Sequence, residues 1–286
     1  MNGKTVLITG GNTGIGLATA KGLGAMGAEI IITSRDDQKG AAAKAEIERE
    51  IGRPIRLERL DLASFESIRA FAARILESTP RLDVLINNAG LILDKRSATV
   101  EGFESTFGIN HLGHFLLTDL LLDRLRESAP ARIVVLASDA HYRAKSGLDF
   151  DDLMSERGSF RGFDVYAKSK LANVMFTREL AKRLEGSGVT VNAAHPGVVA
   201  TEFAGKDDTR GIIGIFFGLI RPFLRTPAKG AATSVYLANS AEVEGVTGRY
   251  FADSREKPPS RPSRDDAACA RLWEASEALI ASVPRQ

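Results

Sequence analysis

Short apolar runs alternate with longer amphipathic segments along most of the chain, and this alternation limits the possible folds more than any other feature. The runs are rich in Val, Ile and Leu, which is typical of strands buried on both faces of a sheet. The segments between them carry apolar residues at helical spacing among Lys, Arg, Glu and Ala. The runs comprise residues 6–8, 29–33, 55–60, 84–86, 133–136 and 189–193, and a later one covers 248–251.

Repeated strand–helix–strand units predict an α/β fold. We expect a doubly wound parallel sheet of the Rossmann type, with about seven strands and helices on both faces. The sequence has no internal repeat and no linker composition, and its 286 residues suit one large domain, which we place at residues 1–286. The segments with helical spacing are residues 15–26, 38–51, 64–77, 115–126, 168–184 and 271–280.

Charge and cysteine content exclude several classes of protein. The net charge is only +2, with no Lys/Arg block, so we expect no nucleic-acid partner. Cys269 is the single cysteine, which excludes an intramolecular disulfide and a cysteine-based metal cluster. The four histidines come without a matching carboxylate motif, so we expect no metal site.

The longest apolar stretch lies late in the chain. Residues 211–220 continue to Leu224 and fall short of the about 20 apolar residues that a membrane-spanning helix needs. We expect a substrate lid around residues 201–226, and the alternative is an apolar patch that touches a membrane surface. The first apolar run is too short for the core of a signal peptide, which favours a cytoplasmic protein, either free or peripheral to a membrane.

A glycine-rich loop follows the first predicted strand and opens the first predicted helix. Helix N-termini bind phosphate through unpaired N–H groups, so this position favours a dinucleotide. We expect Gly10 to allow a tight turn, Gly14 a close approach of the pyrophosphate, and Gly16 the packing of helix on strand. The alternative is a glycine-rich turn without a ligand. The other loop residues expected at the cofactor are Asn12, Thr13 and Ile15.

The end of the second strand bears on the choice of cofactor. An acidic residue there would bind a ribose 2′-hydroxyl, whereas an Arg accommodates a 2′-phosphate. Ser34 stands where the acid would be expected, and Arg35 follows it. The sequence therefore favours NADP(H) over NAD(H). The alternative is a surface Arg paired with Asp36 or Asp37.

Polar groups that could support acid–base chemistry occur at positions expected to meet. Tyr166 and Lys170 are four residues apart, so both lie on one face of a helix. A nearby ammonium stabilises a phenolate and lowers the pKa of the phenol. Ser138, residues 87–90 and residues 196–197 each follow a predicted strand, at the edge where open α/β sheets bind ligands.

This ordered set of motifs resembles the short-chain dehydrogenase/reductase family over nearly the whole chain. Residues 110–115, 169–173 and 195–199 resemble its retinol dehydrogenase branch, to which protochlorophyllide reductases are similar. The motifs that carry the resemblance are Thr9-Gly10-x3-Gly14-x-Gly16, Asn87-Asn88-Ala89-Gly90, Asn110, Ser138, Tyr166-x3-Lys170 and Pro196-Gly197.

The resemblance implies a role for each matched residue. Tyr166 would protonate the carbonyl oxygen, Lys170 would hold the nicotinamide ribose, and Ser138 would hydrogen-bond the substrate oxygen. Asn110 would support a water-linked proton relay to Lys170. The further cofactor-binding residues that it implies are Asp61, Leu62, Asn87, Ala89, Gly90, Pro196, Gly197, Val199 and Thr201. Ser146 and Ser159 lie nearer Tyr166 in sequence and compete with Ser138 for its role.

The function implied by the resemblance is an NADP-dependent oxidoreductase acting on a carbonyl or alcohol. Phe216, Phe217 and Phe223 favour a lipophilic, retinal-like aldehyde or ketone as substrate. The alternatives are a non-catalytic NADP(H)-binding sensor or scaffold, and a protochlorophyllide-type double-bond reductase. The resemblance also implies a homodimer or tetramer, paired through the helices around Phe115 and Lys170.

Overall fold

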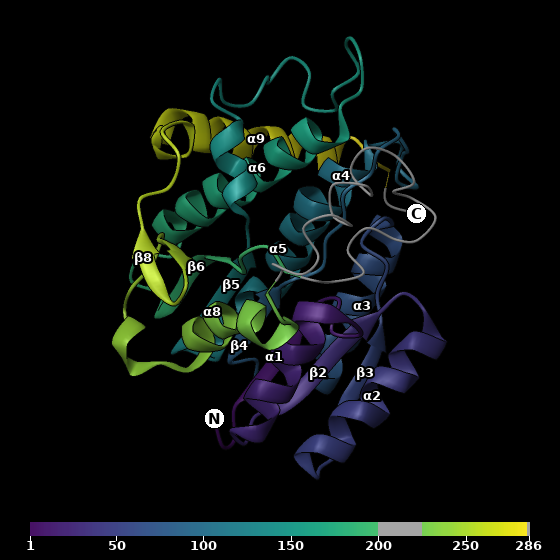
Figure 1. Ribbon diagram of the computed structural model, residues 1–286, viewed down its shortest axis with the longest axis vertical. Helices are drawn as coiled ribbons and strands as arrows, with labels where there is room; N and C mark the ends of the chain where they lie inside the picture. Colours follow the sequence, from purple (N-terminus) through teal and green to yellow (C-terminus); the bar gives the residue numbers. More distant parts are fainter. Residues whose placement is uncertain (200–224, 285–286) are drawn as a thin grey trace.

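The computed structural model describes residues 1–199 and 225–284, in which one sheet lies between two layers of helices (Figure 1). Its strands run in the order β3-β2-β1-β4-β5-β6-β7-β8, and the first seven along the chain are parallel. This confirms the doubly wound α/β fold. The strands are β1 Thr5–Ile8, β2 Glu29–Ser34, β3 Arg56–Arg59, β4 Val84–Asn87, β5 Ala131–Leu136, β6 Val189–His195, β7 Tyr250–Ala252 and β8 Arg255–Lys257.

The eighth strand extends the predicted sheet. β8 pairs antiparallel with β7 after a tight turn at Asp253 and Ser254, which both have positive φ angles, of 54° and 56°. No glycine marks this hairpin, and the side chains of β8 are all exposed. The sequence therefore offers neither a turn signal nor an apolar pattern for this strand.

The helices cover both faces of the sheet. α1, α2 and α8 pack on one face with one half of the core, and α3, α5, α6 and α9 pack on the other face. Side chains of β1 alternate between the halves, since Leu7 joins one core while Val6 and Ile8 join the other. The helical elements are α1 Gly14–Ala25, α2 Asp37–Ile51, α3 Phe65–Ser78, α4 Ser105–Phe107, η1 Gly108–Leu112, α5 Gly113–Glu127, η2 Asp139–Arg143, α6 Gly162–Arg183, α8 Pro227–Asn239, η4 Ala241–Val243, η5 Pro262–Arg264 and α9 Asp266–Ala281.

Two helices differ from expectation. α6 begins at Gly162 rather than at residue 168, and its N-cap, Arg161, makes no side-chain cap that would mark the start in sequence. α8 was not predicted, although Thr226 caps it and Pro227 occupies its first turn, a combination typical of helix starts. The apolar stretch 211–224 and all but two residues of the expected lid lie outside the described residues.

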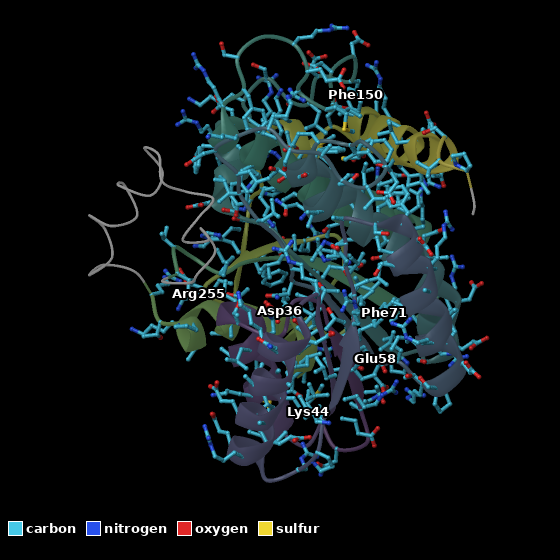
Figure 2. All side chains as sticks on the ribbon, turned by 90° about the vertical axis from the view of Figure 1, so that its right-hand side faces the viewer. Asp36, Lys44, Glu58, Phe71, Phe150 and Arg255 are labelled. Atoms are coloured by element: carbon cyan, nitrogen blue, oxygen red, sulfur yellow. The ribbon has the colours of Figure 1, made fainter. Side chains whose placement is uncertain are left out.

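The C-terminal helix α9 packs against α6 (Figure 1). The Trp273 ring lies 4.7 Å from that of Phe115 and stacks on Phe176 at 5.9 Å, measured between centroids. The Arg183 guanidinium covers the same indole at 4.3 Å. Phe71 on α3 is fully buried in the same half of the core (Figure 2). α9 therefore completes this layer. In the described part of the chain, no helix combines the length and hydropathy that crossing a membrane requires.

The carboxylate of Asp83 links the starts of β1 and β4. It accepts hydrogen bonds from Lys4 Nζ at 2.8 Å, from the Thr5 N–H at 2.9 Å and from Arg81 Nε at 2.8 Å. Burial raises the pKa of Asp83, but these hydrogen bonds outweigh burial and leave the pKa below its ordinary value. The ionised form is therefore the one that stabilises the fold.

We expect Asp83→Asn to lower the free energy of unfolding at pH 7 by about 1–3 kcal/mol, because charged hydrogen bonds are lost. Asp83 has a lower pKa in the folded protein than in the unfolded chain. The stability difference between wild type and Asp83→Asn is therefore fully present above the ordinary carboxyl pKa of about 4, and it disappears as the pH falls through the pKa of Asp83 in the folded protein. Urea denaturation at pH 7 and at acid pH measures it. Asp123→Asn, at an exposed ion pair with Arg126, is the control and should change little. Equal stabilities of Asp83→Asn and wild type at pH 7 would contradict this account.

Candidate active site

The glycine loop and the loop after β4 meet where the strand order reverses, between β1 and β4. Thr9 directly follows β1 and is fully buried. Its hydroxyl oxygen accepts hydrogen bonds from the N–H groups of Asn88 at 2.9 Å and Ala89 at 3.0 Å. The Asn88 side-chain amide donates to the Thr9 carbonyl at 2.7 Å. These bonds hold the two loops together at the point where open α/β sheets bind ligands.

Three glycines shape the backbone of this loop. Gly10 and Gly14 have φ angles of +64° and +53°, which side chains rarely tolerate. A Cβ on Gly16 would collide with the Gly10 carbonyl oxygen and lie 2.6 Å from the side-chain nitrogen of Asn88. Helix α1 can therefore approach the loop this closely only with glycine at position 16.

The N-terminus of α1 leaves its N–H groups available. Its N-cap, Thr13, makes no side-chain cap, and the first turn contains no acidic residue. By contrast, side chains cap other helices: Asp36 caps α2, Ser64 caps α3, and Asp265 caps α9. Free N–H groups and the positive end of the helix dipole suit a phosphate. The loop and this helix end therefore fit the pyrophosphate of a dinucleotide.

The two acids beside Arg35 are engaged elsewhere. Asp36 accepts from the Lys39 N–H at 3.0 Å at the start of α2 (Figure 2), and Asp37 pairs with Arg59 at 3.0 Å. Arg35 is exposed and makes no ion pair with any residue of the described ranges. An ion pair of Arg35 with Asp36 or Asp37, which is the alternative to a phosphate contact, is therefore absent from the described structure.

Tyr166, Lys170 and Ser138 converge beside this loop pair. The ammonium of Lys170 lies 5.6 Å from the centroid of the Tyr166 ring, one turn away on α6. A side-chain hydrogen bond joins Tyr166 to Ser138, which follows β5. Ser146 and Ser159 are both exposed and make no such bond. The geometry thus favours Ser138 over these two serines.

Burial displaces the pKa values of both groups on α6. Burial raises the pKa of Tyr166, and the negative charge of Asp139 also raises it. The hydrogen bond to Ser138 lowers the pKa but offsets only part of this rise. The net shift is opposite to the depression that the Tyr–Lys spacing predicts, because burial outweighs the Ser138 hydrogen bond, which is what lowers the pKa. Burial also lowers the pKa of Lys170 to about 7. Tyr166 therefore stays protonated at neutral pH and is suited to donate a proton.

Asn110 lies in η1, a π-helical turn between α4 and α5. Its side chain accepts from the Leu91 N–H at 2.8 Å and donates to the Leu91 carbonyl at 2.9 Å and to Ser169 Oγ at 3.0 Å. A Cβ on Gly90 would lie 3.0 Å from Asn110 Oδ1 and 3.5 Å from Lys170 Nζ. The structure therefore brings Asn110 and Lys170 together across the backbone of Gly90.

The remaining predicted cofactor residues lie around the same edge. Asn87 donates to Thr118 at 2.8 Å, while its side-chain oxygen is buried without a hydrogen-bond partner. Asp61 accepts from the Ala63 N–H at 2.9 Å. The Leu62 side chain is buried in the core, so only its backbone could face a ligand.

The loop after β6 also reaches α1. Gly197 has a φ angle of +78° and lies against the Arg225 side chain. A Cβ on Gly230 would lie 2.6 Å from Val199 and 3.3 Å from Ile15, so Val199 comes close to the start of α1. The expected cofactor residue Thr201 lies outside the described residues.

Sequence reasoning missed two residues beside Ser138. The Asp139 N–H donates to His195 Nδ1 at 3.2 Å, and His195 Nε2 lies 3.7 Å from the Asp139 carboxylate. Asp139 begins η2 directly after Ser138, three residues beyond the end of β5, and His195 ends β6. Their positions could have identified them as residues of the site.

The match to a family model decides the family. The model described as short chain dehydrogenase matches residues 4–148 and 154–210. The chain belongs to the short-chain dehydrogenase family. This dehydrogenase is 46% identical to retinol dehydrogenase 14 of Homo sapiens over 98% of this chain and 87% of that protein. It is also 46% identical to retinol dehydrogenase 12 of Homo sapiens, over 97% of this chain and 86% of that protein. It is thus an oxidoreductase close to the retinol dehydrogenases.

Solved structures agree with this placement of the dehydrogenase. An uncharacterised protein from Mycobacterium paratuberculosis matches with a TM-score of 0.76 and 34% identity, covering 98% of this chain and 94% of that one. The RhlG protein of Pseudomonas aeruginosa, solved in an active-site complex with NADP, matches with a TM-score of 0.70 and 28% identity. That match covers 88% of this chain and 94% of RhlG.

We expect Gly16→Ala to weaken NADPH binding by at least tenfold and to lower stability by about 1–3 kcal/mol, because the new Cβ overlaps the loop backbone. Fluorescence titration and thermal unfolding measure the two effects. Gly22→Ala is a control on the same helix, since its Cβ would meet only a Val235 methyl at 3.2 Å. Unchanged NADPH affinity in Gly16→Ala would contradict the assignment of this loop.

Proposed function

We propose that the protein is an NADP-dependent oxidoreductase that interconverts a lipophilic aldehyde or ketone and its alcohol. The observation that carries the proposal is the convergence of a protonated phenol, a buried amine and a serine hydroxyl beside an uncapped helix N-terminus. These groups are Tyr166, Lys170 and Ser138. A polar arrangement of this kind matches the needs of carbonyl reduction, in which negative charge develops on the substrate oxygen.

The described residues divide the binding of NADPH between them. The glycine loop and the first N–H groups of α1 would hold the pyrophosphate, and Lys170 would hold the nicotinamide ribose. Bound NADPH supplies the hydride that reduces the carbonyl carbon. A Cβ on Gly90 would lie 3.5 Å from Lys170 Nζ, so glycine at this position leaves the space beside the Lys170 amine free of a side chain.

The protein residues would handle the oxygen and the proton. Ser138 donates a hydrogen bond to the substrate oxygen, and Tyr166 transfers its phenolic proton to that oxygen as the alcohol forms. The resulting phenolate must regain a proton. Lys170, with a pKa near 7, can hold a proton at neutral pH, and Asn110 lies next to it for a relay through water.

The preference for NADP(H) rests on the end of β2. Arg35 is exposed and has no acidic partner among the described residues, so its guanidinium can bind a 2′-phosphate in two-pronged geometry. Ser34 binds the backbone of Asp36 at 2.7 Å and carries no charge that would repel a phosphate. The complex of RhlG with NADP supports the same choice of cofactor.

The substrate class rests on the relatives and on the sequence of the expected lid. Retinol dehydrogenases are named for a lipophilic alcohol, and the apolar stretch of residues 211–224 carries three Phe residues that would favour such a substrate. We expect faster turnover of long-chain or retinal-like aldehydes than of small sugars.

We expect Tyr166→Phe to bind NADPH with wild-type affinity and to lose at least 100-fold in kcat, because the proton donor is gone. Absorbance of NADPH follows turnover, and fluorescence titration follows binding. Phe163→Leu, one turn earlier on the same helix at an exposed position, is the control and should retain activity. Wild-type turnover in Tyr166→Phe would refute the role of this residue. Tight NADPH binding without turnover of any aldehyde or ketone by the wild type would favour a sensor.

We expect Arg35→Ala to raise KM for NADPH by about 10–100-fold, the loss typical of charged hydrogen bonds. KM for NADH should stay the same, because NADH lacks the 2′-phosphate. Arg59→Ala, which removes a neighbouring exposed Arg already paired with Asp37, is the matched control. Parallel changes in KM for both cofactors would rule out a phosphate contact at Arg35.

A further inference from the structure

A buried histidine connects the nucleotide loop to the π-helical turn. His114 lies on α5 and is 2% exposed. Its Nε2 lies 2.9 Å from Thr9 Oγ1, and its Nδ1 lies 3.2 Å from the main-chain oxygen of Asn110. One imidazole ring thus touches the residue that joins the two nucleotide loops and the residue that lies beside Lys170.

The hydrogen bonds around this ring fix its tautomer. The Asn110 carbonyl can only accept, so Nδ1 carries the proton and Nε2 is an acceptor. The Thr9 hydroxyl already accepts from two backbone N–H groups, so it donates its own proton, and His114 at 2.9 Å is a better acceptor than the Ile86 carbonyl at 3.4 Å. Burial and the Lys170 charge together lower the pKa of His114 to about 4, although the hydrogen bond to the Asn110 carbonyl raises it, so the ring stays neutral at pH 7.

An ordered chain of donors results. It runs from the backbone N–H groups of Asn88 and Ala89 to the Thr9 hydroxyl, then through the imidazole, and ends at the Asn110 carbonyl. The Asn110 side chain is fully occupied by Leu91 and Ser169, so its amide cannot replace the histidine as a link to Thr9. The hydrogen bonds of His114 therefore connect the nucleotide loop directly to the turn beside Lys170.

We propose that His114 is a positioning residue that couples the nucleotide loop to the Asn110 turn. Its Nε2 edge orders the loop for the cofactor, and its Nδ1 edge holds the Asn110 carbonyl for proton transfer at Lys170. This inference rests on the proposed function, because it assumes that nucleotide binding and proton transfer occur at these two places.

A second histidine, His111 in the π-helical turn that precedes α5, provides an internal comparison. His111 is also buried, but its Nε2 lies 2.9 Å from Ser276 Oγ on α9, away from the nucleotide loop. The Ser276 hydroxyl donates to the Leu272 carbonyl at 2.7 Å, so it accepts from His111. Ser276→Ala thus removes a buried histidine contact of the same kind without touching the chain that runs through His114.

Three substitutions separate the two edges of the His114 ring. His114→Phe keeps a planar ring and removes both contacts. The side chain of Asn places its amide where Nδ1 lies in His, and that of Gln places its amide where Nε2 lies. His114→Asn can therefore still donate to the Asn110 carbonyl, and His114→Gln can still accept from Thr9.

We expect His114→Phe to raise the Kd for NADPH and to lower kcat, each by about tenfold, because the buried Thr9 hydroxyl loses its better acceptor and the buried Asn110 carbonyl loses the imidazole donor. His114→Gln should restore the wild-type Kd but not the wild-type kcat. His114→Asn should restore the wild-type kcat but not the wild-type Kd. Ser276→Ala should lower Tm and leave both constants within twofold of wild type. Fluorescence titration gives the Kd, and single-turnover oxidation of NADPH by an aldehyde gives the rate.

A purely structural role would give another pattern. If His114→Phe lowered only Tm, or if the Gln and Asn variants rescued both constants alike or neither, the proposal would be overturned. Wild-type protein that binds no NADPH would instead refute the proposed function. If the wild type binds NADPH but reduces no aldehyde, the Kd values alone test the proposal, since only His114→Gln should restore the wild-type Kd.

Discussion

The Thr9 hydroxyl is the contact on which the site depends. It joins the loop after β1 to the loop after β4 at the reversal of strand order, and the glycine loop, Gly90 and the Asn110 turn are all positioned from this junction. Strand ends alone leave loops free to separate. One hydroxyl that accepts two backbone N–H groups and donates to an imidazole holds three segments that lie far apart in sequence.

Burial sets the charge state of the site before any ligand arrives. It raises the pKa of Tyr166 and lowers that of Lys170, so both groups tend toward their neutral forms. A neutral pair costs little to bury, whereas a phenolate and an ammonium would each need a partner. His114 and His111 follow the same rule, since burial lowers the pKa of each and keeps both rings neutral.

Local patterns in the sequence predicted the elements that local physics decides. The apolar runs located the parallel strands, and the glycine spacing located a loop whose φ angles and close contacts require glycine at Gly10, Gly14 and Gly16. The four-residue spacing placed Tyr166 beside Lys170. The link between Thr9 and His114 spans 105 residues, and β8 depends on pairing with β7, so neither leaves a local trace. The predicted direction of the Tyr166 pKa shift was also wrong, because the burial that raises this pKa depends on the whole fold and not on the local sequence.

The position of α9 has a consequence for assembly. Trp273 and its neighbours cover Phe115 and Phe176, so the chain's own C-terminal helix occupies the face on which helices around Phe115 and Lys170 would meet another subunit. For subunits to pair through that face, the Trp273 indole would first have to lose its contacts with the rings of Phe115 and Phe176 and with the Arg183 guanidinium. A partner copy would therefore have to dock over the outer surface of α9, or at a different side of the molecule.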